Sequence, residues 1–383
     1  MKLLEEKECC GCGSCVSACP FNAIKLTKSE DGFFASEIND NKCKNCGICI
    51  QKCPILKFKS QKSDNYKYFA AYSHNNEVLN KSSSGGIFYE LASYFIKNGG
   101  IVFGAAFVTA RKVEHIKVTN LKNLDSILKS KYLQSNAYCC FKEIKKLLVS
   151  NNKVLFSGTP CQIEALNIFL GKNYENLYTV DFICTGVPSQ NVFDEYINYF
   201  ENKYNDELVK IDFRNKKSGW YNYSIHLKFK NNEVYSSRFL NPLIYLQYNH
   251  ISVMHKCLNC PFRNGNSSSD IQLGDLWNGY IINKKLYNKN GVSAVIIKTQ
   301  KGNRLYKSVE NTLCNVIISK NDLLRINKSY SSVVFDDKKR NSFFDEFNHS
   351  LNKYSVIKKY SHISLYNKIK IKKNLLILKI KGR

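Results

Sequence analysis

Hydrophobic and polar positions follow regular patterns along the chain after residue 65. Across residues 87–96 the apolar side chains recur on one face at helical spacing, which predicts an amphipathic helix. The apolar run 101–108 that follows predicts a buried strand. The alternation continues, with strands expected at 68–72, 154–156 and 178–183 and helices at 137–150 and 162–170. Alternating helices and strands predict an α/β layer architecture.

The pattern changes to a period of two from about residue 207. Ile225, Leu227 and Phe229 alternate with polar residues, as in a strand with one exposed face. A turn at residues 231–232 leads into a second expected strand, 233–239. A helix near 242–250 and a strand at 293–298 complete the expected elements. The predicted fold class is therefore mixed α+β and α/β.

Cysteine usage narrows the class of protein. Nine of the 16 cysteines lie before residue 54, so they are concentrated in one cysteine-rich segment. The first 20 residues contain no apolar signal region, and the longest apolar run has eight residues, against roughly 18 for a membrane-spanning helix. We expect a soluble cytoplasmic protein whose clustered thiols are metal ligands rather than disulfides.

The N-terminal cysteines repeat one motif, C-x2-C-x2-C-x3-C-P, which is the signature of two-cluster bacterial ferredoxins. The fourth cysteine of each motif ligates the other cluster. One predicted [4Fe–4S] cluster is held by Cys9, Cys12, Cys15 and Cys53, and the other by Cys43, Cys46, Cys49 and Cys19. Gly11, Gly13 and Gly47 relieve crowding in the loops and leave backbone N–H groups free to face the sulfurs. Cys10 is outside the spacing and is interpreted as a small neighbouring residue.

Four later cysteines follow predicted strands: Cys161, Cys184, Cys257 and Cys260. Thiols at such turns could meet in one site, as a further cluster or a zinc ion requires. The alternative is that they are buried structural residues, which behave as small hydrophobic side chains. That alternative is favoured for Cys139, Cys140 and Cys314.

Two segments have the character of phosphate sites. Residues 82–86 (SSSGG) precede a predicted helix, whose N-terminal N–H groups favour an anion, although a plain helix cap explains the same residues. The turn 158–160 is a second candidate. No G-x-G-x-x-G or Walker A sequence occurs, so a standard Rossmann site is not supported.

A series of short segments, taken together with the cysteine motifs, is recognisable. In chain order they are Ser84-Gly85-Gly86, Lys131-Tyr132-Leu133-Gln134-Ser135, Gly158-Thr159-Pro160-Cys161-Gln162, Ile183-Cys184-Thr185-Gly186, Phe213-Arg214, Gly219-Trp220, Cys257-Leu258-Asn259-Cys260 and Asp270-Ile271-Gln272-Leu273-Gly274-Asp275-Leu276-Trp277. The series resembles the coenzyme F420 hydrogenase/dehydrogenase beta-subunit family, in the form with an N-terminal two-cluster ferredoxin module. The resemblance covers residues 1 to about 300.

The resemblance implies an iron–sulfur flavoprotein with FAD and a third [4Fe–4S] cluster, the latter at Cys161, Cys184, Cys257 and Cys260. It makes three segments the expected flavin contacts, with Ser84, Gly85, Gly86, Lys131, Tyr132, Gln134, Ser135, Gly158, Thr159, Pro160 and Gln162 as the candidate residues. Lys131 would stabilise negative charge on a reduced flavin or a phosphate, unless it is simply a solvated helix charge. No role is assigned to Asp275.

The implied function is an oxidoreductase that passes electrons between iron–sulfur clusters and an FAD-coupled organic partner. The family accepts several substrates, including deazaflavins such as coenzyme F420 and chlorophyll precursors. Other relatives are associated with polysaccharide biosynthesis, and residues 214–220 look most like that group. The alternative is a non-catalytic electron-relay subunit of a larger complex. An electron donor or acceptor protein such as ferredoxin is the expected partner.

The domain organisation follows from the same motifs. Residues 1–60 are expected to form the ferredoxin module, residues 66–300 the family core with an internal boundary near 150–160, and residues 301–383 a C-terminal extension. The polar stretch 59–65 is interpreted as a linker.

The net charge is +26, of which residues 1–60 contribute +2. Residues 352–383 carry ten Lys or Arg and no acid, and the middle of the chain carries the remaining +14. The middle charge is interpreted as coding bias toward Asn, Lys and Ile, with an anionic partner as the alternative. No nucleic-acid motif accompanies it, so nucleic-acid binding is disfavoured. The basic, partly apolar end suits a solvated tail, an anionic membrane surface or an acidic protein partner.

Overall fold

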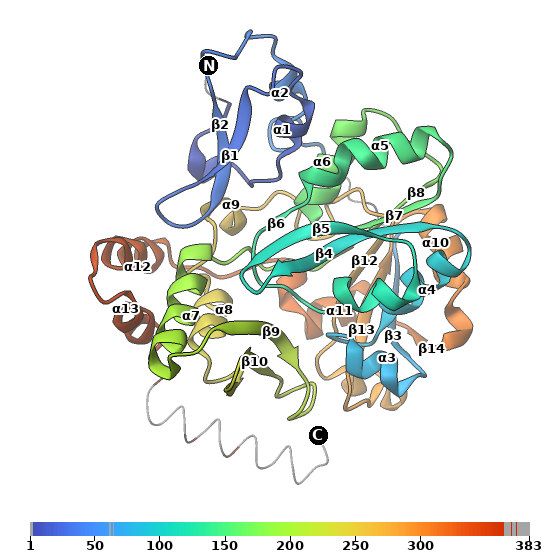
Figure 1. Cartoon of the computed structure of the whole chain (residues 1–383). Coiled ribbons are helices and arrows are strands. Elements are labelled where there is room, and N and C mark those ends of the chain that lie inside the picture. Colours follow the sequence, from blue (N-terminus) through green and yellow to red (C-terminus); the bar gives the residue numbers. More distant parts are fainter. Residues whose placement is uncertain (1–2, 61–62, 64, 364–368, 370–372, 374–383) are drawn as a thin grey trace.

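The computed structural model describes residues 3–60, 63, 65–363, 369 and 373 (Figure 1). Its N-terminal module pairs β1 (Ile24–Lys28) with β2 (Phe34–Ile38) in an antiparallel hairpin and adds two short helices, α1 (Ser14–Ala18) and α2 (Ile48–Gln51). Gly13 and Gly47 precede these helices with φ angles of 72° and 73°. This left-handed conformation is cheap only for glycine, so both glycines set the cysteine loops.

A nine-stranded mixed sheet forms the centre of the core, in the order β14-β3-β13-β12-β8-β7-β4-β5-β6. Strands β4, β7, β8 and β12 run parallel to their neighbours in this group, whereas β12–β13, β13–β3, β3–β14 and β4–β5 are antiparallel pairs. The strands are β3 (Lys67–Ser73), β4 (Ile101–Thr109), β5 (Lys112–Val118), β6 (Ser135–Asn136), β7 (Val154–Ser157), β8 (Leu177–Phe182), β12 (Ile271–Asp275), β13 (Ser293–Ile297) and β14 (Leu313–Ile317).

Helices cover this sheet through apolar side chains that alternate along its strands. Leu91 of α4 packs with Leu155 of β7 in one buried cluster, and Phe141 of α5 packs with Phe156 of β7 in another. Because neighbouring residues of a strand point to opposite faces, Leu155 and Phe156 place these clusters on the two sides of the sheet. The helices of this region are α3 (Asn76–Lys81), α4 (Ile87–Lys97), α5 (Phe141–Val149), α6 (Pro160–Leu170), α10 (Gln300–Lys307) and α11 (Lys320–Ile326).

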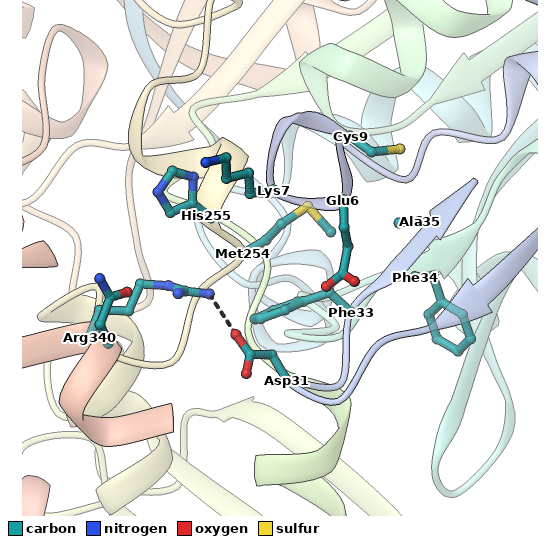
Figure 2. A pocket seen from close by; sticks show the side chains of 11 residues that line it. Glu6, Lys7, Cys9, Asp31, Phe33, Phe34, Ala35, Met254, His255 and Arg340 are labelled. Carbon is teal, nitrogen blue, oxygen red and sulfur yellow. Dashed lines mark hydrogen bonds and ion pairs between the residues drawn. The ribbon is translucent and has the colours of Figure 1, made fainter. Parts of the chain in front are cut away.

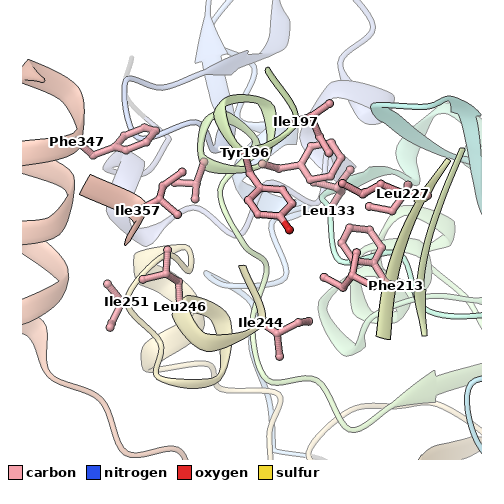
Figure 3. Close-up of a cluster of buried hydrophobic side chains, with 14 of the residues drawn as sticks. Leu133, Tyr196, Ile197, Phe213, Leu227, Ile244, Leu246, Ile251, Phe347 and Ile357 are labelled. Carbon is pink, nitrogen blue, oxygen red and sulfur yellow. The ribbon is translucent and has the colours of Figure 1, made fainter. Parts of the chain in front are cut away.

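A second, smaller layer lies beside the large sheet and contains the three-stranded order β11-β10-β9 (Figure 1). Its core gathers apolar side chains around Tyr196 and Phe213, with Phe347 and Ile357 contributed from the C-terminal part of the chain (Figure 3). The elements are α7 (Gln190–Tyr204), β9 (Leu208–Asn215), β10 (Ser224–Phe229), β11 (Glu233–Ser237), α8 (Pro242–Tyr248), α9 (His255–Leu258), α12 (Asp337–His349) and α13 (Lys353–Tyr360).

The predicted fold class is confirmed: a small ferredoxin-like module precedes a mixed α/β core. Some boundaries differ. The expected helix 137–150 starts as a 3-10 turn, Tyr138–Cys140, before α5 begins. The expected division at residue 301 does not coincide with a break in the fold, since β14 pairs with β3 and α12 and α13 pack in the second layer.

The basic tail is described only in part. Its first portion is α13, in which Val356 and Ile357 are buried. The rest of the tail, residues 364–368, 370–372 and 374–383, lies outside the described residues, and so does its predicted role. Residues 61, 62 and 64 of the expected linker also lie outside them. Within the part of the chain that is described, no helix is both long enough and apolar enough to cross a bilayer.

Candidate functional site

The N-terminal thiols form two groups that match the predicted ligand exchange between motifs. Cys15 lies close enough to Cys9 and Cys53 to feel their charges, and burial raises its pKa to about 12. Cys53 likewise feels the charge of Cys9, although it belongs to the other motif. A separate small cavity is lined by Cys19, Cys43, Cys46 and Cys49. Each group therefore combines cysteines of one motif with the last cysteine of the other.

Backbone N–H groups face several of these sulfurs. The Gly11 N–H donates to Cys9 Sγ at 3.4 Å, and the Ala23 N–H donates to Cys19 Sγ at 3.3 Å. Gly11 has φ 62°, and a Cβ there would approach the Phe34 carbonyl oxygen to 2.3 Å. The expected role of this glycine is therefore seen in the geometry. Such N–H···S bonds stabilise the negative charge of ligated thiolates.

Among the described residues, no three His, Cys, Asp or Glu side chains are arranged to hold a single metal ion. A cubane cluster has a different requirement, because each thiolate binds a different iron at a corner of the cube. The relevant observation is therefore that four thiols share one cavity.

Charged contacts fix the ferredoxin module against the core. Asp31 accepts from Arg340 of α12 at 3.4 Å, and Lys256 of α9 pairs with Glu8 at 2.6 Å. A cavity of about 310 Å³ lies at this junction and is lined by Cys9 together with Phe33, Met254 and other residues (Figure 2). The module therefore has a defined position relative to the core, with Cys9 facing the junction.

The four later cysteines come together. One cavity in the core is lined by Cys161, Cys184, Cys257 and Cys260. Cys161 is the second residue of α6, which follows β7; Cys184 follows β8, and Cys257 lies in α9. Burial raises the pKa of Cys184 to about 12 and that of Cys260 to about 11. Thiols held in such a place stay protonated until a metal displaces the protons, so this donor set fits an iron–sulfur cluster.

The same cavity contains a fifth cysteine, Cys10. The neighbouring Cys12 side chain and burial raise the pKa of Cys10 well above its ordinary value, and the Cys161 side chain opposes this shift. The interpretation of Cys10 as merely a small neighbouring residue did not anticipate this position.

A larger cavity of about 330 Å³ adjoins the core cysteines and contains most of the expected flavin contacts. Cys184, Thr159 and Gly186 line both cavities. The expected contacts that line the larger one are Ser84, Gly86, Lys131, Tyr132, Ser135, Gly158, Thr159 and Gln162.

Three expected contacts lie elsewhere. The Gln134 side chain accepts from the Phe34 N–H at 2.9 Å and so ties β2 of the ferredoxin module to the core. Gly85 donates its N–H to Ser293 Oγ at 3.0 Å. Pro160 lines the cysteine cavity and is the first residue of α6. These three residues support the two sites without lining the larger cavity.

The Gly158-Thr159-Pro160 turn is a capping box. The Thr159 side chain caps the backbone of Gln162, whose Oε1 accepts from the Thr159 N–H at 2.9 Å. The Gln162 Nε2 also donates to Ser135 Oγ at 3.0 Å. This network fixes the wall that the two cavities share and the start of the helix that carries Cys161.

Lys131 and His115 supply the larger cavity with basic groups. The Lys131 ammonium donates to the Leu128 carbonyl at 2.5 Å, and burial lowers its pKa to about 7. His115 Nε2 lies 2.9 Å from the Ser157 carbonyl, which fixes the proton on that nitrogen and leaves Nδ1 buried and without a partner. Burial lowers the pKa of His115 to about 4, so the ring is neutral.

Arg214 lines the larger cavity together with Asp275 of β12. Its guanidinium forms two hydrogen bonds with Asp275 and one with the Ser83 carbonyl at 2.9 Å. It also lies 4.3 Å from the ring centroid of Tyr223. Its Nε is buried and has no partner. The ion pair joins β9, β12 and the SSSGG loop around one wall of the cavity.

Two segments of the chain match models of known protein families. Residues 151–317 match the family model for the C terminus of the coenzyme F420 hydrogenase/dehydrogenase beta subunit, and residues 8–55 match that for a 4Fe-4S dicluster domain. Over residues 151–317 the chain is therefore similar to this beta-subunit family. The recognised resemblance is confirmed, and the coarse function, iron–sulfur electron transfer in an oxidoreductase family, follows from it.

No curated protein matches the chain. Among solved structures, a chain of the F420-reducing [NiFe] hydrogenase complex from Methanosarcina barkeri is similar at 18% identity, with a TM-score of 0.48, over 77% of this chain and 96% of that chain.

Sequence reasoning missed three residues that the fold places at the cavities: Cys10, His115 and the partner of Arg214, Asp275. The segment containing Asp275 was part of the recognised series, but an aspartate in a strand gives no sign of which cation it meets. His115 belongs to no motif. For Cys10 the sequence held one signal: its thiol directly follows the ligand cysteine Cys9. A rule that counts only the motif spacing ignores this residue.

Proposed function

We propose that this protein is an iron–sulfur flavoprotein oxidoreductase. It would hold two [4Fe–4S] clusters in the N-terminal module, a third in the cysteine cavity of the core and FAD in the larger cavity. It would pass electrons between a protein donor such as ferredoxin and a small organic partner, such as coenzyme F420 or a substrate of polysaccharide biosynthesis.

The donor set of the core cavity supports the third cluster. Four thiols from three separate elements converge in a buried place, and the charges of Cys161 and Cys260 act on Cys184. Arg263 adds positive charge near Cys184 and Cys260. Its guanidinium also donates to the Leu258 carbonyl at 3.0 Å and so braces the Cys257–Cys260 loop. A nearby cation favours thiolate over thiol and therefore favours ligation.

The larger cavity supports the assignment of FAD. Bound FAD supplies the exchange of two electrons as hydride on one side and of single electrons on the other. Ser83, Ser84 and Gly86 border the cavity just before α4, where backbone N–H groups suit a phosphate. Lys131 and the unpartnered His115 Nδ1 and Arg214 Nε offer polar contacts to an acceptor-rich ligand.

The observation that carries the proposal is that Cys184 lines both cavities. FAD bound in the larger cavity would therefore be separated from a cysteine ligand of the proposed core cluster by one shared wall. Cys184 and Thr159 make this wall, and the Cys161 Sγ lies 3.1 Å from Thr159 Oγ1. Close contact through few atoms favours single-electron transfer between the two sites.

Anaerobic purification with iron, acid-labile sulfide and flavin quantified together tests the proposal. We expect about twelve irons and one FAD per chain, since three cubane clusters contain four irons each. About twelve irons without flavin would support the alternative of an electron-relay subunit. Zinc without labile sulfide would contradict both.

A further inference from the structure

A row of three polar side chains leads away from the larger cavity. Asp181 of β8 lines that cavity and is fully buried. The Ser267 hydroxyl donates to Asp181 Oδ2 at 2.5 Å, and the Lys298 ammonium donates to the same hydroxyl at 2.8 Å. Ser267 is also fully buried, whereas Lys298, directly after β13, is partly exposed. The row therefore joins a buried carboxyl at the cavity to a residue that reaches the surface.

The two hydrogen bonds are oriented as in a proton relay. A hydroxyl can accept one hydrogen bond while it donates another, and the Ser267 hydroxyl does both. It can therefore take a proton from the Lys298 ammonium and give its own proton to the Asp181 carboxylate without moving its oxygen. Lys298 also donates to the Ser267 carbonyl, which holds the ammonium in this place.

The second carboxyl oxygen, Asp181 Oδ1, is buried and has no hydrogen-bond partner among the described residues. Gln272 of β12 is the register partner of Asp181, so the two side chains lie on the same face of the sheet. The Gln272 Oε1 is likewise buried and lacks a partner among these residues. A buried polar atom without a partner is rare in folded proteins. Two neighbouring acceptor oxygens without a donor leave a place for a proton on Asp181.

The surroundings bring the proton affinities of the two ends of the row closer together. Burial raises the pKa of Asp181, and the charge of Lys298 opposes this shift. Burial lowers the pKa of Lys298, and three acidic side chains oppose that shift: Asp181, Asp270 and Glu164. Two tyrosines, Tyr66 and Tyr330, also feel the charge of Asp181. Transfer of a proton from the ammonium to the carboxylate is easier when the two pKa values lie closer together.

We propose that Asp181 is the proton-transfer residue of the larger cavity and that Lys298 supplies it with protons through Ser267. This role rests on the proposed FAD, because clusters carry only electrons, whereas reduction of a flavin also takes up hydrogen.

The step balances as follows. Two electrons reach FAD from the core cluster, and one proton leaves Asp181, so that the O–H bond of the acid breaks and a bond from this hydrogen to the flavin forms. The Ser267 proton moves to Asp181, a Lys298 proton moves to Ser267, and a proton from water restores the ammonium. One proton from water is consumed for every two electrons, and oxidation reverses each movement.

The experiment uses the full chain, purified anaerobically, as wild type, Asp181→Asn and Ser267→Ala. Asp345→Asn and Ser308→Ala are the matched controls, since both residues are exposed and line neither cavity. Iron, FAD and circular dichroism are measured for each protein. Dithionite then reduces the protein in a stopped-flow instrument, and the loss of flavin absorbance is followed in H2O and in D2O.

Flavin reduction in Asp181→Asn should slow by roughly 100-fold, the contribution typical of a positioned proton donor, while the clusters are reduced at the wild-type rate. Ser267→Ala should also be slow, and slower still in D2O, because delivery of the proton then limits the rate. Both controls should behave as wild type. An infrared titration of the flavin-depleted protein gives a readout apart from turnover. The carboxyl of Asp181 should take up its proton at a higher pH than that of Asp345, since burial raises its pKa.

Wild-type rates of flavin reduction in Asp181→Asn, with iron and FAD retained, would overturn the inference and leave the proposed function standing. Should Asp181→Asn fail to fold, wild-type rates in Ser267→Ala would overturn the relay by themselves. A wild-type protein that binds no FAD would instead overturn the proposed function, and this inference with it.

Discussion

The guanidinium of Arg214 donates to both carboxylate oxygens of Asp275, with Nη1 to Oδ2 at 2.9 Å and Nη2 to Oδ1 at 3.2 Å. The Arg214 side chain is 3% exposed, so its charge depends on this partner. Arg214 lies on β9 and Asp275 on β12, and these strands belong to different sheets. The pair therefore joins the two layers of the core at the wall of the larger cavity.

Removal of the Asp275 charge should destabilise this junction. Asp275→Asn keeps the shape but leaves Arg214 buried and unneutralised, which costs about 3 kcal/mol of unfolding free energy, because breaking a buried pair from one side costs about 3–5 kcal/mol and Asp275 is 19% exposed. Urea unfolding measures the change. Glu207→Gln, in the surface pair of Glu207 with Lys230, is the matched control and should change little. Equal stability of both variants would contradict the structural role.

Lys131 should make anion binding in the larger cavity depend on pH. Burial lowers its pKa to about 7, with Asp212 opposing and Lys129 adding to the shift. Only the protonated amine attracts an anion, so the affinity of the metal-loaded, flavin-depleted protein for FAD should fall as pH rises above 7. Calorimetric titration between pH 6 and 9 would measure this decline.

Lys131→Met provides the test of that assignment. The variant should bind FAD more weakly at pH 6 and should lose most of the pH dependence, since no amine remains to titrate there. Lys122→Met, on an exposed 3-10 turn, is the control and should keep the wild-type profile. A pH dependence that survives in Lys131→Met would assign the effect to another group in the cavity.

Cys46→Ala should remove one N-terminal cluster. Cys46 is exposed, and its cavity also contains Cys19 of the first motif. We expect a loss of about four irons, together with weaker retention of the first N-terminal cluster, because the two motifs exchange ligands. Flavin bound in the core should stay. Iron and flavin assays check this, and unchanged iron would exclude Cys46 as a ligand.

The parts of the site that could be predicted from sequence are those that depend on local spacing or strand ends. The eight N-terminal cysteines lie in short loops, where ligand geometry fixes the spacing. The places of Cys161, Cys184, Cys257 and Cys260 after predicted strands left their convergence open. The family resemblance made it the expectation, and the structure brings all four to one cavity.

The remainder depends on tertiary packing. The partner of Arg214 depends on how β9 and β12 are packed against each other. The sequence of neither strand shows this packing. The apolar residues of α12 and α13 complete a core whose other members lie more than 100 residues earlier, so residues 301–383 looked like an appendage. Cys10 was discounted because its approach to Cys161 depends on the docking of the ferredoxin module.

The position of α13 gives a suitable truncation point for a test of the basic tail. Val356 and Ile357 of α13 are buried, so shortening the chain at residue 351 would damage the second layer. A chain ending at residue 363 avoids this and removes seven Lys or Arg and no acid. The full chain should sediment with anionic vesicles at low salt, and the shortened chain should not. Equal sedimentation of the two forms would locate the attraction in the middle of the chain.

Cys161→Ala should remove iron from the core alone. Cys161 lines the core cavity, and its charge acts on Cys184, Cys257 and Cys260. Without it only three of the four proposed ligands remain, and we expect about four fewer irons with the N-terminal EPR signals retained. Cys314→Ala is the matched control, since Cys314 lies on β14 and lines neither cavity. If both variants keep all their iron, the core cavity holds buried thiols and no cluster, and electrons must cross from the ferredoxin module to the larger cavity without it.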